Sequence, residues 1–167
     1  MGKGKVSLTG AIGGGVRLRP ARESDAEFLF KLRNDPEVRR SAFNEKPLVW
    51  EEHLSWMANK LASHKTTIFI AEVEGQPAGQ VRFDLEEEGA VVDITLAQHL
   101  RGRGLGTILL EQGVGHFITM MPGVSIVAYV KKENTPSLRC FKKAGFRDEG
   151  AVIIQGTSCH RMLFLSD

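Results

Sequence analysis

Cysteine, tyrosine and net charge are all scarce in this chain of 167 residues. Only two cysteines occur, which excludes the disulfide framework of a small secreted domain. The formal net charge is +2, and the lysines and arginines are spread along the chain, so a nucleic-acid-binding surface is not expected. No stretch reaches the roughly 20 apolar residues of a membrane-spanning helix. The five histidines have no metal-ligand spacing. We therefore expect a cytoplasmic protein without a metal, nucleic-acid or membrane partner.

The composition that remains is typical of one globular domain, with 42% hydrophobic and 25% charged residues. A chain of this size buries roughly two-thirds of its surface. Residues 1–15 are rich in glycine and contain no apolar core, which predicts a flexible leader rather than a secretory signal. We expect the folded domain at residues 16–166, as a monomer or a homodimer.

Hydrophobic periodicity predicts an α/β domain with the element order βααβββαβαββ. The first strand is expected at 16–21, followed by a helix that Ser24 caps, with Glu27 at the capping-box position, and that ends near Asn34. The other predicted elements are a helix at 48–61, three antiparallel strands within 66–97, a helix at 105–120, a strand at 124–130, a helix at 135–144, and two strands at 147–155 and 161–165 around a turn at 156–157.

The segment QHLRGRGLGT (98–107) places three glycines and two arginines between a strand and a helix. The first N–H groups of a helix have no partner within it, and the helix dipole adds partial positive charge there. Glycine lets a ligand approach these amides closely. The segment therefore predicts a site for a phosphate or a pyrophosphate.

Three phosphate-binding patterns compete for these glycines. No Lys-Ser or Lys-Thr pair follows them, so a P-loop is excluded. A dinucleotide fingerprint fails because Thr107 or Leu109 occupies the place of its last glycine. The pattern Arg/Gln-x-x-Gly-x-Gly/Ala fits at Arg101, Gly104 and Gly106.

A second motif lies in NTPSLRCFKKAGF (134–146), where Asn, Ser, Phe and Gly-Phe recur at a fixed spacing. Together the two motifs, in this strand order, resemble the GCN5-related N-acetyltransferases, and the resemblance covers residues 16–165. It implies a mixed, mostly antiparallel sheet of six to seven strands flanked by about four helices. It also implies that acetyl-CoA is the cosubstrate.

The resemblance assigns the coenzyme contacts to two groups of residues. The pyrophosphate would bind the turn, and the pantetheine arm would run beside the strand that precedes it, with the second motif on its far side. The residues implied are Thr95, Leu96, Arg101, Gly102, Arg103, Gly104, Leu105, Gly106, Thr107, Asn134 and Phe141.

Acetyl transfer also needs a base, an oxyanion partner and a proton for the leaving thiolate. Asp93 interrupts an apolar strand and is the candidate base, although alternation could equally place it on a solvent face. The amide near Leu96 could donate to the oxyanion. The family often has a tyrosine where this chain has Phe141, so Ser137, a water molecule, or unaided departure of the thiolate must take its place. Cys140 is interpreted as packing rather than as a nucleophile.

We expect the acceptor to be a small-molecule primary amine, and four residues are candidates to contact it: His53, Trp56, Arg82 and Asp84. Three of them have an alternative, since the histidine could be a packing residue and Arg82 and Asp84 could pair with neighbouring charges. LRNDPEVR, H-x-x-W and VRFD are similar to acetyltransferases of bacterial sugar-nucleotide pathways, in particular pseudaminic acid biosynthesis, which implies a nucleotide-linked aminosugar. A ribosomal-protein-type N-terminal acetyltransferase and a non-catalytic CoA-binding module remain alternatives.

Overall fold

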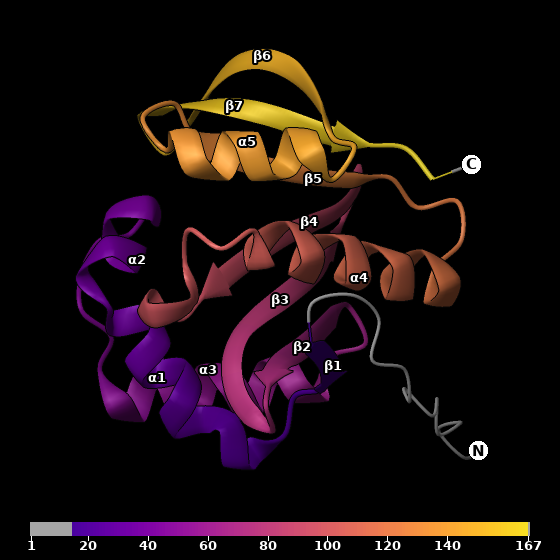
Figure 1. Cartoon of the computed structure of the whole chain (residues 1–167). Coiled ribbons are helices and arrows are strands. Elements are labelled where there is room, and N and C mark those ends of the chain that lie inside the picture. Colours follow the sequence, from indigo (N-terminus) through magenta and orange to yellow (C-terminus); the bar gives the residue numbers. More distant parts are fainter. Residues whose placement is uncertain (1–14, 167) are drawn as a thin grey trace.

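Seven strands form one twisted sheet, and helices cover both of its faces (Figure 1). The computed structural model describes residues 15–166; most of the predicted leader, residues 1–14, and residue 167 lie outside that part. The strands are β1 (Val16–Pro20), β2 (Thr66–Val73), β3 (Gln76–Glu86), β4 (Gly89–Leu96), β5 (Ile126–Lys131), β6 (Arg147–Ile154) and β7 (Thr157–Phe164). The helices are α1 (Ala26–Asn34), α2 (Pro36–Ser41), α3 (Trp50–Ala62), α4 (Leu105–Met120) and α5 (Thr135–Lys143), with short 3-10 turns η1 (Glu23–Asp25) and η2 (Gln98–Leu100).

The sheet order is β1-β2-β3-β4-β5-β7-β6, and neighbouring strands are antiparallel except for β4 and β5, which are parallel. The turn between β2 and β3 has positive φ at both Glu74 (52°) and Gly75 (78°), a conformation typical of two-residue hairpin turns. The predicted α/β class, the antiparallel β2–β3–β4 meander and the mixed sheet are confirmed.

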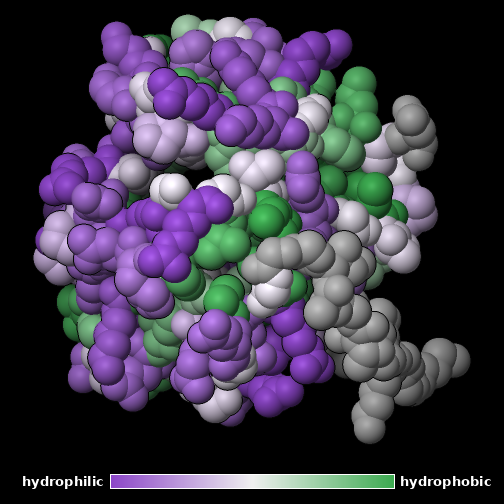
Figure 2. All heavy atoms as spheres, in the orientation of Figure 1, coloured by the Kyte–Doolittle hydropathy of each residue, from purple (hydrophilic) through white to green (hydrophobic). Residues whose placement is uncertain are grey.

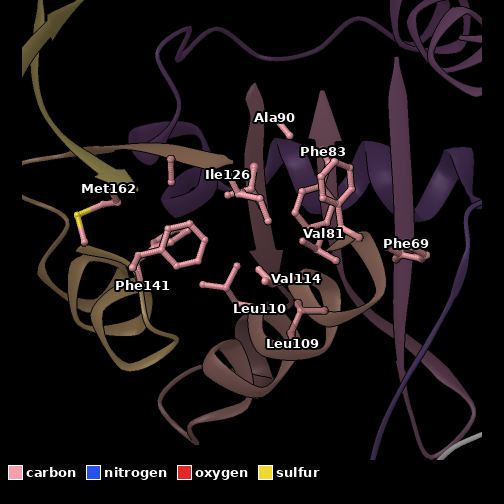
Figure 3. Close-up of a cluster of buried hydrophobic side chains, with 14 of the residues drawn as sticks. Phe69, Val81, Phe83, Ala90, Leu109, Leu110, Val114, Ile126, Phe141 and Met162 are labelled. Atoms are coloured by element: carbon pink, nitrogen blue, oxygen red, sulfur yellow. The ribbon is translucent and has the colours of Figure 1, made fainter. Parts of the chain in front are cut away.

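Each face of the sheet has its own core. On one face α4 packs against β3, where the rings of Phe83 and Phe117 stack with centroids 4.3 Å apart (Figure 3). Gly113 makes this close approach possible, because a Cβ there would lie 2.7 Å from the Val81 side chain. On the other face α1 and α3 bury a smaller cluster that includes Leu29 and Met57. Burial on both faces explains the apolar run IFIA at residues 68–71 in the middle of β2.

Three details of the sequence-based prediction are wrong. Asp25, not Ser24, closes the first helical turn, because its carboxylate accepts from the Arg22 amide at 2.7 Å, while Glu27 pairs with Lys31 on the helix surface. The short helix α2 was not predicted; Asp35 caps it by accepting from two backbone amides. Strand β7 starts at residue 157, four residues before the predicted 161, because the turn lies at residues 155–156.

Strands β4 and β5 diverge, and this divergence creates the site. Their residue pairs are Ala90 with Ile126 and Val91 with Val127, and pairing ends there although both strands continue. The rest of β4 keeps its pairing with β3 as far as Leu96. The sheet therefore opens on one side of β4, next to the glycine-rich turn.

Candidate active site

The glycine-rich turn, residues 101–107, leads from η2 into α4 and is called the coenzyme turn below. Gly102 and Gly104 have φ of 74° and 75°, in the left-handed region that favours glycine. Within the described chain, none of the backbone amides from 102 to 107 donates a hydrogen bond. These amides lie at the positive end of a sixteen-residue helix. The turn therefore has the donor set that a pyrophosphate requires.

The side chain of Arg101 connects the coenzyme turn to β4 and to the start of α2. Its Nε donates to the Leu96 carbonyl at 2.9 Å, and its Nη1 lies 2.7 Å from a Glu37 carboxylate oxygen and 3.6 Å from one of Asp35. Its positive charge is thus shared with two carboxylates at the start of α2. Arg103, in contrast, is exposed. Of the two arginines in the motif, only Arg101 has its guanidinium engaged in contacts within the described part of the protein.

A cleft of about 620 Å³ opens between the diverging strands, the coenzyme turn, α2 and α5. Figure 2 shows the hollow between the surfaces of α5 and α2, with hydrophilic side chains around it. Eleven of the residues predicted for the site line this cleft: Asp93, Thr95, Leu96, Arg101, Gly102, Gly104, Gly106, Thr107, Asn134, Ser137 and Phe141. Arg103, Leu105, His53, Trp56, Arg82 and Asp84 are not among its lining residues.

The free edge of β4 presents backbone groups to the cleft. The Ala90 amide donates to Ser125, on the β5 side, and the Ala97 amide donates to Ala78, on the β3 side. Because successive residues of a strand alternate, the amides of Ile94 and Leu96 point toward β5, beyond the end of the β4–β5 pairing. An extended chain lying in the cleft could pair with this edge as a short extra strand would.

The N-terminus of α5 forms the opposite wall. Asn134 caps the helix, with its Oδ1 accepting from the Ser137 amide at 3.3 Å, and its Nδ2 donates to the Ser41 hydroxyl of α2 at 3.3 Å. Phe141 is 3% exposed and packs edge-on against Phe146 at 5.0 Å. The motif residues therefore build the helix end as well as line the cleft, and α2 bridges the opening of the sheet.

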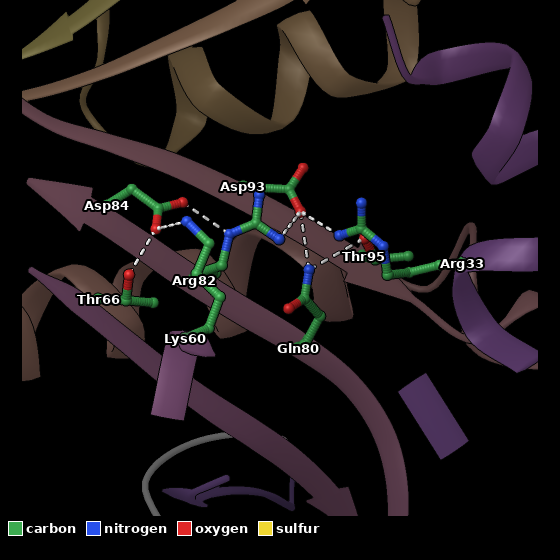
Figure 4. Close-up of polar contacts among 8 residues, drawn as sticks. All are labelled: Arg33, Lys60, Thr66, Gln80, Arg82, Asp84, Asp93 and Thr95. Atoms are coloured by element: carbon green, nitrogen blue, oxygen red, sulfur yellow. Dashed lines mark hydrogen bonds and ion pairs between the residues drawn. The ribbon is translucent and has the colours of Figure 1, made fainter. Parts of the chain in front are cut away.

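Asp93 lies on β4 at the cleft, with 44% of its side chain exposed (Figure 4). Its hydrogen bond and ion pairs reach one oxygen, Oδ2: Gln80 Nε2 donates at 2.7 Å, and the guanidinium nitrogens of Arg82 and Arg33 lie 3.8 and 3.9 Å away. The carboxylate is thus held from the protein side by one amide and two cations. Asp93 is neither buried in the sheet nor simply a solvent-facing residue.

Asp84 is engaged in a network of its own beside Arg82 (Figure 4). It accepts from Lys60 Nζ at 2.7 Å, Thr66 Oγ1 at 2.8 Å and Arg82 Nε at 2.8 Å. Burial raises the pKa of Asp84, but the Lys60 ammonium, the Arg82 guanidinium and the Thr66 hydroxyl outweigh it, so that the pKa lies below its usual value. The carboxylate is therefore charged and paired at neutral pH.

Trp56 and His53 lie beneath this network. The guanidinium carbons of Arg33 and Arg82 lie 5.1 and 5.4 Å from the Trp56 ring centre, within cation–π range. His53 is 3% exposed, stacks on Trp56 and donates from Nε2 to the Ala26 carbonyl at 2.9 Å. Burial lowers the pKa of His53 more than the bond to Ala26 raises it, which favours the neutral imidazole. This placement matches the packing alternative for the histidine.

Sequence reasoning missed several residues of the cleft. Arg33, Glu37, Arg39 and Lys46 come from α1, α2 and the segment before α3, and Gln80 lies beneath Asp93 on β3. Only Gln80 gave a local signal, because it is a polar residue inside the mostly apolar run PAGQVRF. Three of the four charged residues, Glu37, Arg39 and Lys46, lie in the unpredicted helix α2 or in the segment that follows it.

The charge of the cleft is predominantly positive. Six cationic side chains line it, against the two carboxylates Glu37 and Asp93. The cations are Arg33, Arg39, Lys46, Arg101, Arg139 and Lys143.

Among residues 15–166, no cluster of three or more His, Cys, Asp or Glu side chains could hold a metal ion. No helix in the same range is long and apolar enough to cross a membrane.

Comparison with known proteins connects this geometry to a family. The model of the acetyltransferase (GNAT) domain matches residues 16–147. The spermidine N(1)-acetyltransferase of Escherichia coli K12 is 24% identical over 141 residues, 83% of this chain and 76% of that protein. An N-alpha-acetyltransferase of Sulfurisphaera tokodaii is 24% identical over 145 residues, covering 79% and 80%. The crystal structure of a Vibrio cholerae spermidine N-acetyltransferase with CoA and spermine shares the fold, with a TM-score of 0.82, 20% identity, and 91% and 96% coverage.

The free amides of the coenzyme turn and the open edge of β4 fit an acyl-CoA, and a match to the family over most of the chain agrees with them. The chain belongs to the GNAT acetyltransferase family and is an N-acetyltransferase that uses acetyl-CoA as its cosubstrate.

Proposed function

We propose that this enzyme acetylates a primary amine on a small molecule that carries negative charge, with a nucleotide-linked aminosugar as the preferred acceptor. The observation that carries this proposal is the charge of the part of the cleft formed by α1, α2, the segment before α3 and Asp93 of β4, called the acceptor wall below. Arg33, Arg39 and Lys46 lie on that wall, and Asp93 is its one carboxylate apart from Glu37, which Arg101 already pairs. Such a wall attracts a diphosphate and repels a polycation.

The coenzyme side would bind through the backbone. The amides of residues 102–107 would hold the diphosphate, and the Ile94 amide on the free edge of β4 would orient the pantetheine arm. Arg139 and Lys143, on the α5 wall, add positive charge for the phosphates of the coenzyme. When bound, acetyl-CoA supplies the acetyl group on a thioester.

Asp93 would remove the proton that the acceptor ammonium must lose before it can attack. Its Oδ2 is held by Gln80 and the two arginines, which leaves Oδ1 for the amine or for a bridging water. The Leu96 amide would donate to the developing oxyanion. Ser137 would hold a proton near the departing sulfur, because Phe141 stands where the family often has tyrosine.

The names of the relatives point to other acceptors, spermidine in one case and an N-alpha amino group in another. A polycation such as spermidine would meet Arg33, Arg39 and Lys46 at like charge, which costs binding free energy. A protein N-terminus remains the second candidate on the strength of the N-alpha-acetyltransferase relative. Three cations on one wall favour an anionic acceptor over either alternative.

The test is acetyl-CoA turnover with a matched panel of acceptors. The panel contains a UDP-linked 4-amino-deoxysugar, the same aminosugar without its nucleotide, spermidine, and a peptide with a free N-terminus. We expect the highest kcat/KM with the UDP-linked sugar, and competitive inhibition of that reaction by UDP. A preference for spermidine or for the peptide would contradict the proposed acceptor, and CoA binding without thioester consumption for any amine would indicate a non-catalytic module.

A further inference from the structure

Gln80 is a fully buried polar side chain that the proposed mechanism does not yet explain. It lies on β3, opposite Thr95 of β4, and is 0% exposed. Its Oε1 atom is buried and accepts no hydrogen bond within the described residues. A buried carbonyl without a donor is costly, and an apolar side chain of the same shape would avoid that cost. Packing alone therefore does not account for a glutamine at this position.

The amide nitrogen of the same side chain points at the candidate base. Nε2 donates to Asp93 Oδ2 at 2.7 Å and lies 3.5 Å from Thr95 Oγ1 (Figure 4). Rotating the amide by 180° would place Oε1 against the carboxylate, oxygen to oxygen. The bond to Asp93 thus fixes the orientation of Gln80 and leaves its carbonyl without a partner.

The other groups around Asp93 attract it without directing it. Arg33 and Arg82 are at ion-pair distance, 3.9 and 3.8 Å, which is beyond hydrogen-bond length. Asp93 is 44% exposed, so its carboxylate needs a directional contact to keep one rotamer. The short bond from a buried amide on a central strand supplies that contact.

We infer that Gln80 is a positioning residue for acetyl transfer: by holding Oδ2 of Asp93 it keeps Oδ1 turned into the cleft, where the acceptor amine loses its proton. The inference rests on the role proposed above for Asp93. Gln80 itself touches neither substrate, and its contribution is made in the chemical step rather than in binding acetyl-CoA.

The test is a double-mutant cycle of Gln80→Met and Asp93→Asn. Gln80→Met keeps the length of the side chain and removes both the donor and the orphaned carbonyl. We expect kcat to fall about tenfold or more, because the base is misplaced, while KM for acetyl-CoA changes less than twofold and the thermal midpoint does not fall. In the Asp93→Asn background the same change should lower kcat no further.

Two further variants keep the test decisive. Gln80→Leu also lacks the amide donor and the carbonyl, and it should lose at least as much kcat as Gln80→Met. Gln76→Met makes the same substitution at an exposed position of β3 and should leave kcat unchanged. Equal losses from Gln80→Met with and without Asp93, or a rise in KM for acetyl-CoA with kcat intact, would overturn the inference. Wild-type kcat in Asp93→Asn would instead refute the proposed role of Asp93, and with it the premise.

Discussion

The two sides of the cleft are built in opposite ways. The coenzyme turn offers the backbone amides of six consecutive residues, 102–107, and its geometry depends on glycines with positive φ. The acceptor wall is made of side chains from α1, α2, the segment before α3 and β4, which tertiary packing brings together. A backbone site is specified locally and can be shared by a whole family, whereas a side-chain site can change its charge without disturbing the fold.

The largest expected effect comes from straining the backbone of the turn. Gly104→Ala places a Cβ at φ 75° with no atom within 4 Å, so its cost is conformational, about 1 kcal/mol. Relief of that strain would turn amides away from the diphosphate. Loss of one such charge-assisted bond corresponds to about 10- to 100-fold weaker CoA binding, measurable by calorimetry.

Gly123→Ala is the matched control for this change. Gly123 has φ of 78°, is equally open, and lies in the turn between α4 and β5. It should show a similar loss of stability with unchanged CoA affinity. Equal CoA affinities of the two variants would mean that the coenzyme turn does not hold the diphosphate.

Reversing the charge of the acceptor wall should change the preference among acceptors and leave the affinity for acetyl-CoA unchanged. Arg39→Glu combined with Lys46→Glu should lower kcat/KM for an anionic acceptor about tenfold and raise it for spermidine, since a field of the opposite sign then faces the amine. The difference should shrink at high salt. Arg40→Glu changes the charge of the same helix at an exposed residue that does not line the cleft, and it should have little effect. An unchanged acceptor preference in the double variant would exclude this wall from acceptor recognition.

The same contrast explains what could be predicted from the sequence. The order of helices and strands, apart from α2, and the coenzyme turn follow from local patterns, because hydrophobic periodicity and turn residues are specified within short stretches of sequence. Helix α2 was missed because it is six residues long and begins at Pro36, where the proline predicts the end of the preceding helix. Without α2, nothing in the sequence brings Arg39 to the cleft or pairs Arg101 with Glu37.

Side-chain partners were the least predictable part. Arg82 and Asp84 share a strand face, as alternation predicts, but alternation does not say that Lys60 and Thr66 complete the pair. The choice between acceptor contact and internal pairing depends on α3, whose position over the sheet is a property of the tertiary structure.

Asp84→Asn tests how much the ion pairs around Asp84 stabilise the folded protein. Removing the charge should destabilise the protein by about 1 kcal/mol, because Lys60 and Arg82 lose a common partner. The pKa of Asp84 is lowered in the folded state, so its stabilising effect is present above the ordinary value of 3.8 and is lost as the pH falls below it.

Urea unfolding at pH 7 and pH 3 measures this difference. Wild type should exceed Asp84→Asn in unfolding free energy at pH 7, and the gap should narrow at pH 3. A gap that is constant with pH would show that the lost contribution does not come from the ionised carboxylate.

The smallest expected effect is at Cys140, which lies in the cleft where the coenzyme turn meets α5. Its Sγ accepts from the Thr107 hydroxyl at 3.6 Å, and burial raises the pKa of the thiol, so the neutral and weakly nucleophilic form prevails at pH 7. Direct transfer to the amine requires no acyl-cysteine. Cys140→Ala should therefore keep kcat within about twofold, measured as thiol release from acetyl-CoA with any accepted amine. Loss of turnover with CoA binding intact would instead assign the sulfur a covalent role and would contradict direct transfer of the acetyl group to the amine.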